Sequence, residues 1–138
     1  MKFLKNNRKY IVAGIYRHPD RDIGDFSVQL DKILENISKK KIPCIIAGDI
    51  NIDFVKYDAH RETTDYVTNL LVNNFIPMII MPSRVTANSA TIIDHIYYYE
   101  GSNSKKNQNM FTGNLSDHLP NYLLITDKHS KADAKRPK

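Results

Sequence analysis

The stretch IPCIIAGDIN, residues 42–51, decides the fold of this chain. Residues 42–47 are apolar and rich in isoleucine, which is typical of a buried strand, and the run stops at Gly48-Asp49. A helix is predicted just before this strand, because apolar residues recur at helical spacing from Asp25 to about Lys39. Asp25 is the predicted N-cap, and three lysines at residues 39–41 suit the negative end of the helix dipole.

The residues on either side continue the alternation of strands and helices. Residues 10–16 are β-branched and aromatic, which predicts a strand that ends before Arg17. A second helix is predicted from Thr63 or Thr64, and Pro77 forbids its continuation. Its predicted buried residues are Tyr66, Val67, Leu70, Leu71 and Phe75. Further strands are predicted at residues 78–81, 83–86, 91–99 and 122–125. This order predicts an α/β fold with a mixed β-sheet and flanking helices.

The composition sets limits on the kind of protein. The 138 residues, of which 41% are hydrophobic and 25% charged, suit one globular domain. No apolar run approaches the ~20 residues that span a bilayer, so no membrane partner is expected. The lone Cys44 predicts a buried, inert thiol and an intracellular setting. The net charge of +5 suits a polyanion-binding protein, although residues 128–138 are predicted to be a basic, disordered tail after a domain of residues 1–127.

Two polar residues directly follow the strand predicted at residues 42–47. Asp49 and Asn51 would face the same way if the extended pleat continued, and Gly48 would permit an unusual turn. One interpretation is a carboxylate that orients an attacking water, with a carboxamide on a phosphate. The other is an Asx turn that caps the strand end. The residues alone leave both interpretations open.

Asp94 is an acid inside an otherwise apolar strand, TIIDHIY at residues 91–97. An unpaired buried carboxylate is costly, so Asp94 is expected to have a cationic or donor partner, and His118 is the best candidate. Because neighbouring residues of a strand point to opposite faces, His95 faces away from Asp94. We therefore expect His95 to be a structural or surface imidazole.

Two further groups lie where predicted strands end. Ser116-Asp117-His118 is either an N-cap or a turn that presents a metal ligand and a proton-transfer group. Tyr16 and Arg17 are either an ordinary strand-end aromatic and a solvated cation, or a phenol and a guanidinium that contact a phosphate. With the acids above, these residues could hold a hard divalent cation and activate a water. That combination indicates phosphoester hydrolysis.

Together these motifs resemble the endonuclease/exonuclease/phosphatase superfamily. In that family a strand-end Tyr, a Gly-Asp-x-Asn, an acid-bearing strand and a Ser-Asp-His follow one another in this order. Within it, the chain is most similar to the endonuclease domains of non-LTR (LINE-type) retrotransposons. The segments that carry this similarity are YRHP at 16–19, PSRVT at 82–86, SATIIDHI at 89–96 and LSDH at 115–118. The resemblance extends over residues 10–125.

The resemblance implies metal-dependent phosphodiester hydrolysis by a DNA endonuclease (nicking) domain, with DNA as its partner. The implied catalytic residues are Tyr16, Asp49, Asn51, Asp94 and His118. The implied phosphate or DNA contacts are Tyr16, Arg17, Asn51 and Arg84. Asp49 would orient the water, and Asp94 would orient the imidazole of His118. Asp117 would lie at a metal site for Mg²⁺ (or Mn²⁺), which neutralises charge on the phosphoryl group.

The chain departs from the family in its first part. The family has an early strand with an Asn and a strand with the principal metal-ligating Glu, and none of Glu35, Glu62 and Glu100 matches that ligand in position. We therefore expect a truncated C-terminal half, with about half of the family's two-sheet α/β sandwich. It would once have been fused to a reverse transcriptase, and would be nuclear if functional. A catalytically inactive remnant and a phosphatase of the same superfamily are the alternatives.

Overall fold

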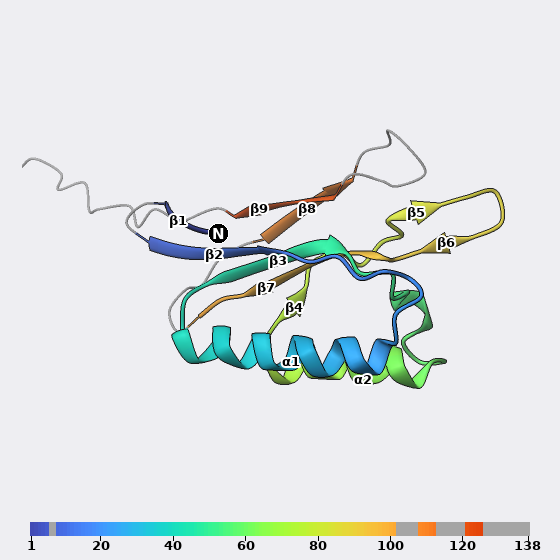
Figure 1. Ribbon diagram of the computed structural model, residues 1–138. Coiled ribbons are helices and arrows are strands. Elements are labelled where there is room, and N and C mark those ends of the chain that lie inside the picture. The colour runs from blue at the N-terminus through green and yellow to red at the C-terminus, as the bar shows by residue number, and fades with distance from the viewer. Residues whose placement is uncertain (6–7, 102–107, 113–120, 126–138) are drawn as a thin grey trace, which may run out of the picture.

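The structure, a computed structural model, describes residues 1–5, 8–101, 108–112 and 121–125 (Figure 1). Strands and helices alternate along the first half of the chain, and strands follow. The elements are β1 (Lys2–Lys5), β2 (Arg8–Gly14), α1 (Ile23–Lys40), β3 (Cys44–Asp49), the 3-10 helix η1 (Phe54–Lys56), α2 (Arg61–Val72), β4 (Ile76–Pro77), β5 (Arg84–Val85), β6 (Ala90–Thr91), β7 (Asp94–Tyr99), β8 (Gln108–Thr112) and β9 (Asn121–Ile125).

The main sheet is mixed, with the strand order β1-β2-β3-β7-β4. β2 and β3 are parallel and pair Ile11 with Cys44, whereas β1, β7 and β4 are antiparallel to their neighbours. The parallel pair is joined by a crossover that contains α1, as parallel strands require. Both helices lie on one face of this sheet, and the β8–β9 hairpin lies over the other face (Figure 1). The predicted α/β fold class, with a mixed sheet and helices beside it, is confirmed.

Both predicted helices are present, but two details differ from the prediction. The side chain of Asp22, not Asp25, caps α1, because its Oδ1 accepts a hydrogen bond of 2.8 Å from the Asp25 backbone N–H. α1 ends at Lys41, which adopts the left-handed conformation. α2 begins at Arg61, two residues before the predicted Thr63. It buries Tyr66, Val67 and Leu70 as predicted, whereas Leu71 is exposed.

The strands also follow the predicted order, with one clear error. Residues 78–81 do not form the predicted strand; the strand here is β4, which comprises Ile76–Pro77 and pairs with β7. Pro77 lies in this edge strand, where a missing backbone donor is tolerated. The predicted strand at residues 91–99 is interrupted between β6 and β7. β9 contains the predicted residues 122–125.

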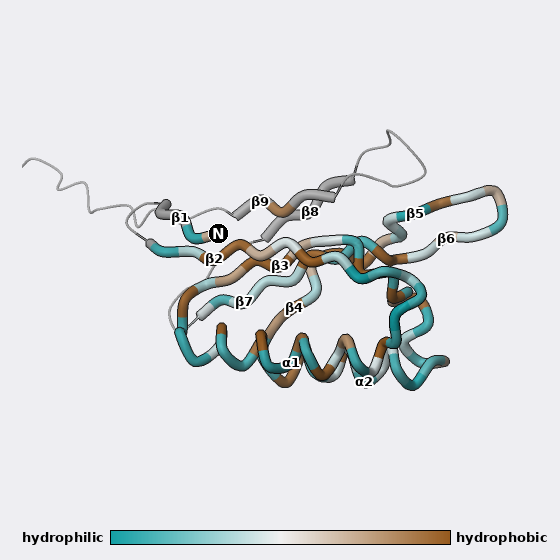
Figure 2. The backbone as a smooth tube through the Cα atoms, in the orientation of Figure 1, coloured by the Kyte–Doolittle hydropathy of each residue, from teal (hydrophilic) through white to brown (hydrophobic). Residues whose placement is uncertain are grey.

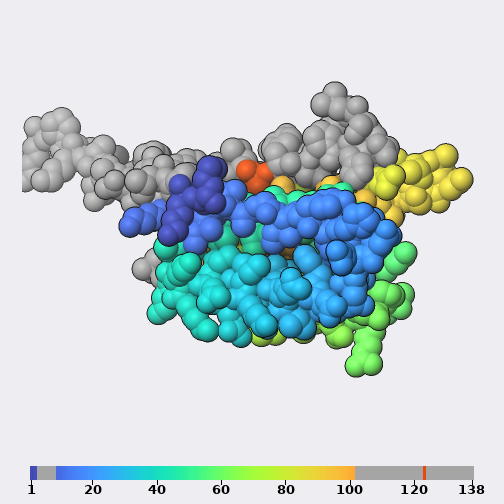
Figure 3. Space-filling view, viewed as in Figure 1, coloured from blue at the N-terminus to red at the C-terminus, as the bar shows by residue number. Residues whose placement is uncertain are grey.

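The core lies between the helices and the main sheet. Apolar positions recur along α1, α2, β2 and β3 (Figure 2). The main cluster joins buried residues of both helices to β3 and β7, among them Leu34, Ile46, Tyr66 and Tyr97. A smaller cluster on the other face contains Ile79, Ile92 and Ile96, and Leu123 of β9 packs against it. α1 and the first strands form the outer surface on the viewed side of the molecule (Figure 3). Apolar contacts therefore stabilise both faces of the sheet.

Gly48 is needed for close packing of the backbone, not for the unusual turn that its sequence position suggested. A Cβ atom at Gly48 would lie 1.6 Å from the carbonyl oxygen of Ile15. The next hydrogen bond of the same ladder joins the Ile15 N–H to the Ala47 carbonyl, at 3.0 Å. Only a residue without a Cβ lets β2 and β3 approach this closely where both strands end.

Cys44 lies at the start of β3 and is completely buried. Burial raises the pKa of its thiol to about 11, so the thiol is protonated and inert at neutral pH. The prediction that the Cys44 thiol is buried is confirmed. Within the part of the chain that the structure describes, no helix is long and apolar enough to cross a membrane.

Candidate functional site

The candidate site lies at the end of the sheet where β2 and β3 finish and β7 begins. Asp49, the last residue of β3, pairs directly with Asp94, the first residue of β7. The ladder continues for one step beyond the strands, because the Ile50 N–H donates to the Ile93 carbonyl at 2.9 Å. Two carboxylate-bearing residues are thus fixed opposite each other by backbone hydrogen bonds. Both are half-buried.

Asn51 turns the chain at this end of β3. It adopts a left-handed conformation, with φ of 53°, so the extended pleat that would align it with Asp49 does not continue. Oδ1 of Asp49 accepts a hydrogen bond of 3.2 Å from the Asn51 backbone N–H. This is the Asx turn that the sequence allowed as one interpretation. The Asx turn occupies one carboxylate oxygen of Asp49. It also brings Asn51 to the same end of the sheet as Asp49.

Arg17 is the buried cation of the site, with only 4% of its surface exposed. Its Nε donates to the Ile50 carbonyl at 2.8 Å and its Nη2 to the Asn51 carbonyl at 2.7 Å. Its Nη1 donates to the carbonyls of Pro19 and Arg21. The guanidinium therefore binds backbone oxygens of two loops. The solvated cation that one interpretation predicted is not what the structure has.

Arg17 and Asn51 hold each other reciprocally. Nδ2 of Asn51 donates to the Arg17 carbonyl at 2.9 Å, while the Arg17 backbone N–H donates to the Asp49 carbonyl at 3.1 Å. Burial lowers the pKa of the Arg17 guanidinium, and the nearby Tyr66, Asp22 and Asp49 act in the opposite direction. We call this set of hydrogen bonds between Arg17 and residues 49–51 the Arg17 clamp. It joins the loop after β2 to the loop after β3.

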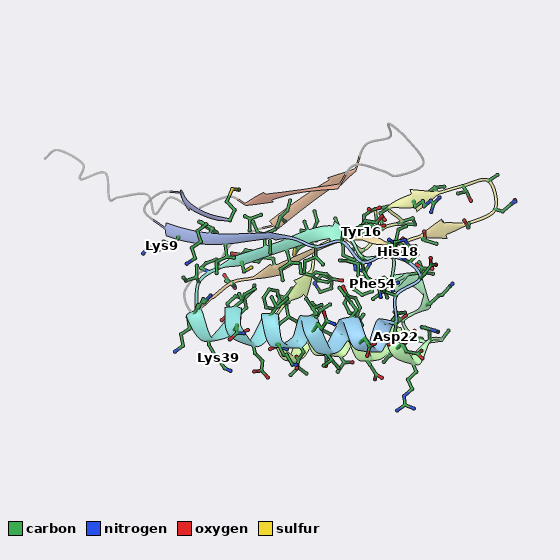
Figure 4. The ribbon with its side chains drawn as sticks, viewed as in Figure 1. Lys9, Tyr16, His18, Asp22, Lys39 and Phe54 are labelled. Carbon is green, nitrogen blue, oxygen red and sulfur yellow. The ribbon has the colours of Figure 1, made fainter. Side chains whose placement is uncertain are left out.

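Tyr16 and His18 flank Arg17 and lie outside the clamp, at the same end of the molecule (Figure 4). The side chain of Tyr16 is 65% exposed. Beside it, the loop of residues 16–22 and the first turns of α1 enclose a hollow of about 590 Å³. Its lining is polar, with the side chains of Arg21, Asp22, Asp25 and Gln29 among others. Tyr16 is thus positioned to contact a molecule that approaches the sheet end.

Asp94 is held by a serine that the sequence reasoning missed. Oγ of Ser83, which is completely buried, accepts hydrogen bonds from the backbone N–H groups of Ile93 at 3.1 Å and Asp94 at 2.9 Å. The sequence singled out the PSRVT segment, which contains Ser83 directly before Arg84, but it assigned Ser83 no role of its own. Arg84 itself lies on β5 of a two-stranded sheet and is exposed.

Asp53 is a second residue that sequence reasoning missed. Its Oδ1 accepts from the Val55 N–H, which caps η1, and also from the Ile92 N–H at 3.0 Å. A single carboxylate therefore ties the loop after β3 to the segment before β7. In the sequence, an acid just before Phe54-Val55 indicates a helix cap. This local pattern does not predict the second hydrogen bond of Asp53, to the distant Ile92 N–H.

His95 faces the helices, as its position next to Asp94 predicted. Its Nδ1 lies 2.5 Å from the Tyr97 hydroxyl and 3.2 Å from the Tyr66 hydroxyl, and its Nε2 lies 2.9 Å from the Ile92 carbonyl. Phe54 stacks on the ring at 4.5 Å. Burial lowers the pKa of His95 to about 4, so the imidazole is neutral at pH 7. It is a structural residue behind the site.

Two predicted site residues, Asp117 and His118, lie outside the described residues. The predicted hydrogen bond between Asp94 and His118 therefore stays a prediction. Among the described residues, no group of three or more His, Cys, Asp or Glu side chains could hold a metal ion. Asp49 and Asp94 supply hard oxygen donors of the type that Mg²⁺ prefers, but this part of the chain does not complete a coordination sphere by itself.

Comparisons with known proteins identify a family and a shared fold. The sequence pattern of a family described as "Endonuclease-reverse transcriptase" matches residues 10–122. Among solved structures, the endonuclease domain of TRAS1, a telomere-specific non-LTR retrotransposon, superposes with a TM-score of 0.65 at 13% identity. That match covers 94% of this chain and 63% of the TRAS1 domain, so the chain spans less than two thirds of its length.

A second solved structure, of SmcL, superposes with a TM-score of 0.50 at 15% identity and covers 88% of this chain and 52% of that one. At these identities both superpositions show a shared fold. No curated protein matches the sequence.

Proposed function

Since the chain belongs to the endonuclease-reverse transcriptase family, we propose that its sheet-end site hydrolyses phosphodiester bonds in DNA, as a nicking endonuclease of retrotransposon type. The observation that carries this proposal is the direct pairing of Asp49 with Asp94, next to the turn at Asn51. Two carboxylates and a carboxamide at one rim suit the hydrolysis of a phosphate diester. Residues 1–127 form the catalytic unit in this proposal.

Asp49 is proposed to orient the attacking water. One of its oxygens accepts from the Asn51 N–H, which leaves the other able to accept from a water. Because the carboxylate is fixed by the ladder with β7, the water would be held in a defined position against the phosphorus atom. Asp94 is proposed to orient the imidazole of His118, which would stabilise charge on the phosphate or transfer a proton.

Asn51 and Tyr16 are proposed to bind the scissile phosphate. The Asn51 amide uses one N–H for the Arg17 carbonyl, and its second N–H can donate to a phosphate oxygen. Tyr16, which is exposed and directly precedes Arg17, offers its hydroxyl, and Arg84 is proposed as a contact to DNA further along the strand. For Arg17 we propose a positioning role in place of the predicted phosphate contact, because its guanidinium is buried against four carbonyls.

A divalent cation, Mg²⁺ or Mn²⁺, would supply charge neutralisation on the phosphoryl group when bound. Asp117 is the proposed ligand from this chain, together with oxygen donors of the sheet end. The principal Glu of the family has no counterpart in this sequence, so slow turnover is expected from residues 1–138. DNA is the proposed partner, and the nucleus is the proposed place of action because the substrate is there.

The test is nicking of supercoiled plasmid by the purified chain at a high ratio of protein to DNA, with Mg²⁺ or Mn²⁺. Relaxed circles should form slowly and should not form in excess EDTA. Asp49→Asn and Asp94→Asn should each abolish nicking, since a lost catalytic carboxylate costs on the order of a hundredfold or more. Asp65→Asn, which removes an exposed carboxylate on α2, should nick like the unaltered chain.

Two results would overturn the proposal. One is the absence of cation-dependent nicking by the unaltered chain under these conditions. The other is nicking by Asp49→Asn at the rate of Asp65→Asn, which would place the activity elsewhere or in a contaminant. Hydrolysis of phosphate monoesters in place of the plasmid would instead favour the phosphatase alternative.

A further inference from the structure

Basic residues gather at the end of the sheet opposite the candidate site. The parallel register Ile11 with Cys44 places the start of β2 beside the end of α1, where Lys39 and Lys40 lie in the last helical turn and Lys41 follows as the C-cap. The antiparallel pairing of Lys5 with Arg8 brings the last residue of β1 to the same end. Lys9 and Lys39 lie together at this end in Figure 4, with Tyr16 and His18 at the other.

The basic side chains that the structure describes at this end are open to solvent. Lys9, Lys39, Lys40 and Lys41 are all exposed. The start of β2 and the end of α1 meet at one edge of the space-filling surface (Figure 3). We call these four lysines the basic end. The acidic residues nearby are Glu35, which pairs with Lys39 at 3.2 Å, and Glu100 after β7.

The position of the basic end separates it from the site. α1 has 18 residues and runs from the site end to the basic end, which is about 27 Å at 1.5 Å per residue. A duplex whose axis crosses α1 at the Asp49 end spans less than this length, so in that orientation it does not reach Lys40. The four lysines then lie outside the phosphate contacts of the candidate site.

One simple explanation is that the lysines only complement the dipole of α1. That accounts for Lys39 and Lys40 in the last helical turn. It does not account for Lys9, which comes from β2. Single-stranded nucleic acid is usually bound by exposed aromatic rings, but the described aromatic side chains nearest this end, Tyr10 and Tyr99, are buried. Exposed lysines without such rings suit the phosphate backbone of a duplex.

We propose that the basic end is a sequence-independent contact for the phosphate backbone of a second segment of duplex DNA, away from the segment at the candidate site. The contact needs neither the metal ion nor cleavage. It would let one chain hold DNA at both ends of its sheet.

The test is binding of a short fluorescent DNA duplex to the full chain in EDTA, measured by anisotropy over a range of salt concentrations. The variant Lys9→Gln/Lys40→Gln/Lys41→Asn removes three charges, and asparagine suits the left-handed conformation at residue 41. We expect roughly tenfold weaker binding at moderate salt and a salt slope lower by about 3, given about 0.9 for each of three phosphate contacts. The matched control Lys32→Gln/Lys56→Gln/Arg61→Gln removes the same charge elsewhere and should bind within about twofold of the unaltered chain.

A third variant separates charge from folding. Lys9→Arg/Lys40→Arg keeps both charges and should bind like the unaltered chain, and loss of binding in this variant would contradict the proposal. So would equal losses in the two glutamine variants, or a preference for anionic vesicles over the duplex. The outcome is independent of the proposed function, because anisotropy in EDTA reports binding whether or not plasmid is nicked with Mg²⁺.

Discussion

At the scale of single residues, Arg17 determines the shape of the candidate site. Four carbonyl oxygens from two loops converge on its guanidinium, and a lysine ammonium at the same place cannot reach them all. We expect Arg17→Lys to lower the free energy of unfolding by about 2–3 kcal/mol, because buried carbonyls lose their donors. Urea unfolding measures this loss, and amide exchange at Asn51 should become faster in the variant.

Arg21→Lys is the matched control for Arg17→Lys. Arg21 lies in the same loop and is exposed, and its backbone carbonyl, which a lysine retains, is what binds Arg17. Its unfolding free energy should stay within about 0.5 kcal/mol of the unaltered chain. Similar losses of unfolding free energy in the two variants would mean that the Arg17 clamp stabilises the fold no more than an exposed residue of the same loop.

His95 makes the stability of the fold depend on pH. Burial lowers its pKa to about 4 in the folded chain, whereas an unfolded histidine titrates near 6.5. Between these values the unfolded chain binds more protons, so the folded state loses stability as the pH falls from about 6.5 towards 4. The loss should total about 3 kcal/mol for this group. Unfolding free energies measured from pH 7 to pH 4 test it.

The variant His95→Phe should be less stable at pH 7, since the Tyr97 hydroxyl loses its acceptor, but its stability should vary less over this pH range. His18→Gln, which alters an exposed histidine, should keep the full pH dependence. An unchanged slope in His95→Phe would exclude His95 as its source.

Single residues also show what sequence could and could not predict about the site. Asp49 and Asn51 were predicted as candidates because they directly follow an apolar strand, and Asp94 because an acid inside an apolar strand is unusual; both are local patterns. The burial of Arg17 was not predictable, because its carbonyl partners at Ile50 and Asn51 are more than thirty residues away in the chain. The contacts of Ser83 are shorter in range but depend on how β7 begins.

At the scale of elements, the close approach of β2 and β3 depends on Gly48. A methyl group there would lie 1.6 Å from the Ile15 oxygen, so the strands must separate at the end that holds Asp49. Gly48→Ala should therefore lower the unfolding free energy by about 3 kcal/mol or more, as overpacking of a rigid backbone does. Gly14→Ala is the control, because a Cβ at Gly14 meets nothing within 4 Å. Chemical denaturation of both variants should separate them clearly.

Helices and strands were predicted well where the apolar residues of a segment follow one clear pattern. The helical spacing of apolar residues before Lys39 and the isoleucine-rich run after Pro43 gave α1 and β3. The strand predicted at residues 78–81 was wrong because an apolar run alone does not distinguish a paired strand from a loop, and Ile76–Pro77 pair with β7 instead. The cap of α1 was misplaced because Asp22 and Asp25 both suit that role in sequence.

At the scale of the whole molecule, the two faces of the sheet differ in the size of the apolar cluster that packs against each of them. The helices cover a large cluster, whereas the β8–β9 hairpin meets a small one through Leu123. We expect hydrogen exchange of the β9 amides at a lower free energy than that of β3, because segments with few buried contacts open locally. Exchange monitored by NMR would show it. Equal protection in β3 and β9 would mean that both open only with the whole domain.

The fold class was predictable because the order of strands and helices restricts an α/β chain to few arrangements. The mixed character of the sheet was also expected. The position of the charged residues at one end of the sheet or the other could not be predicted, because it depends on strand register. No local sequence pattern predicts the pairing of Ile11 with Cys44.

The accessibility of the Cys44 thiol would report on opening of the fold. It is the only thiol in the sequence and lies in the centre of three hydrogen-bonded strands, paired with Ile11 on one side and Tyr99 on the other. The side chain of Cys44 lies in the core between the sheet and the helices, so a disulfide reagent can reach its sulfur only when the helices separate from the sheet. The rate of a colour change with such a reagent would therefore report how often this core opens, without any label being added to the protein.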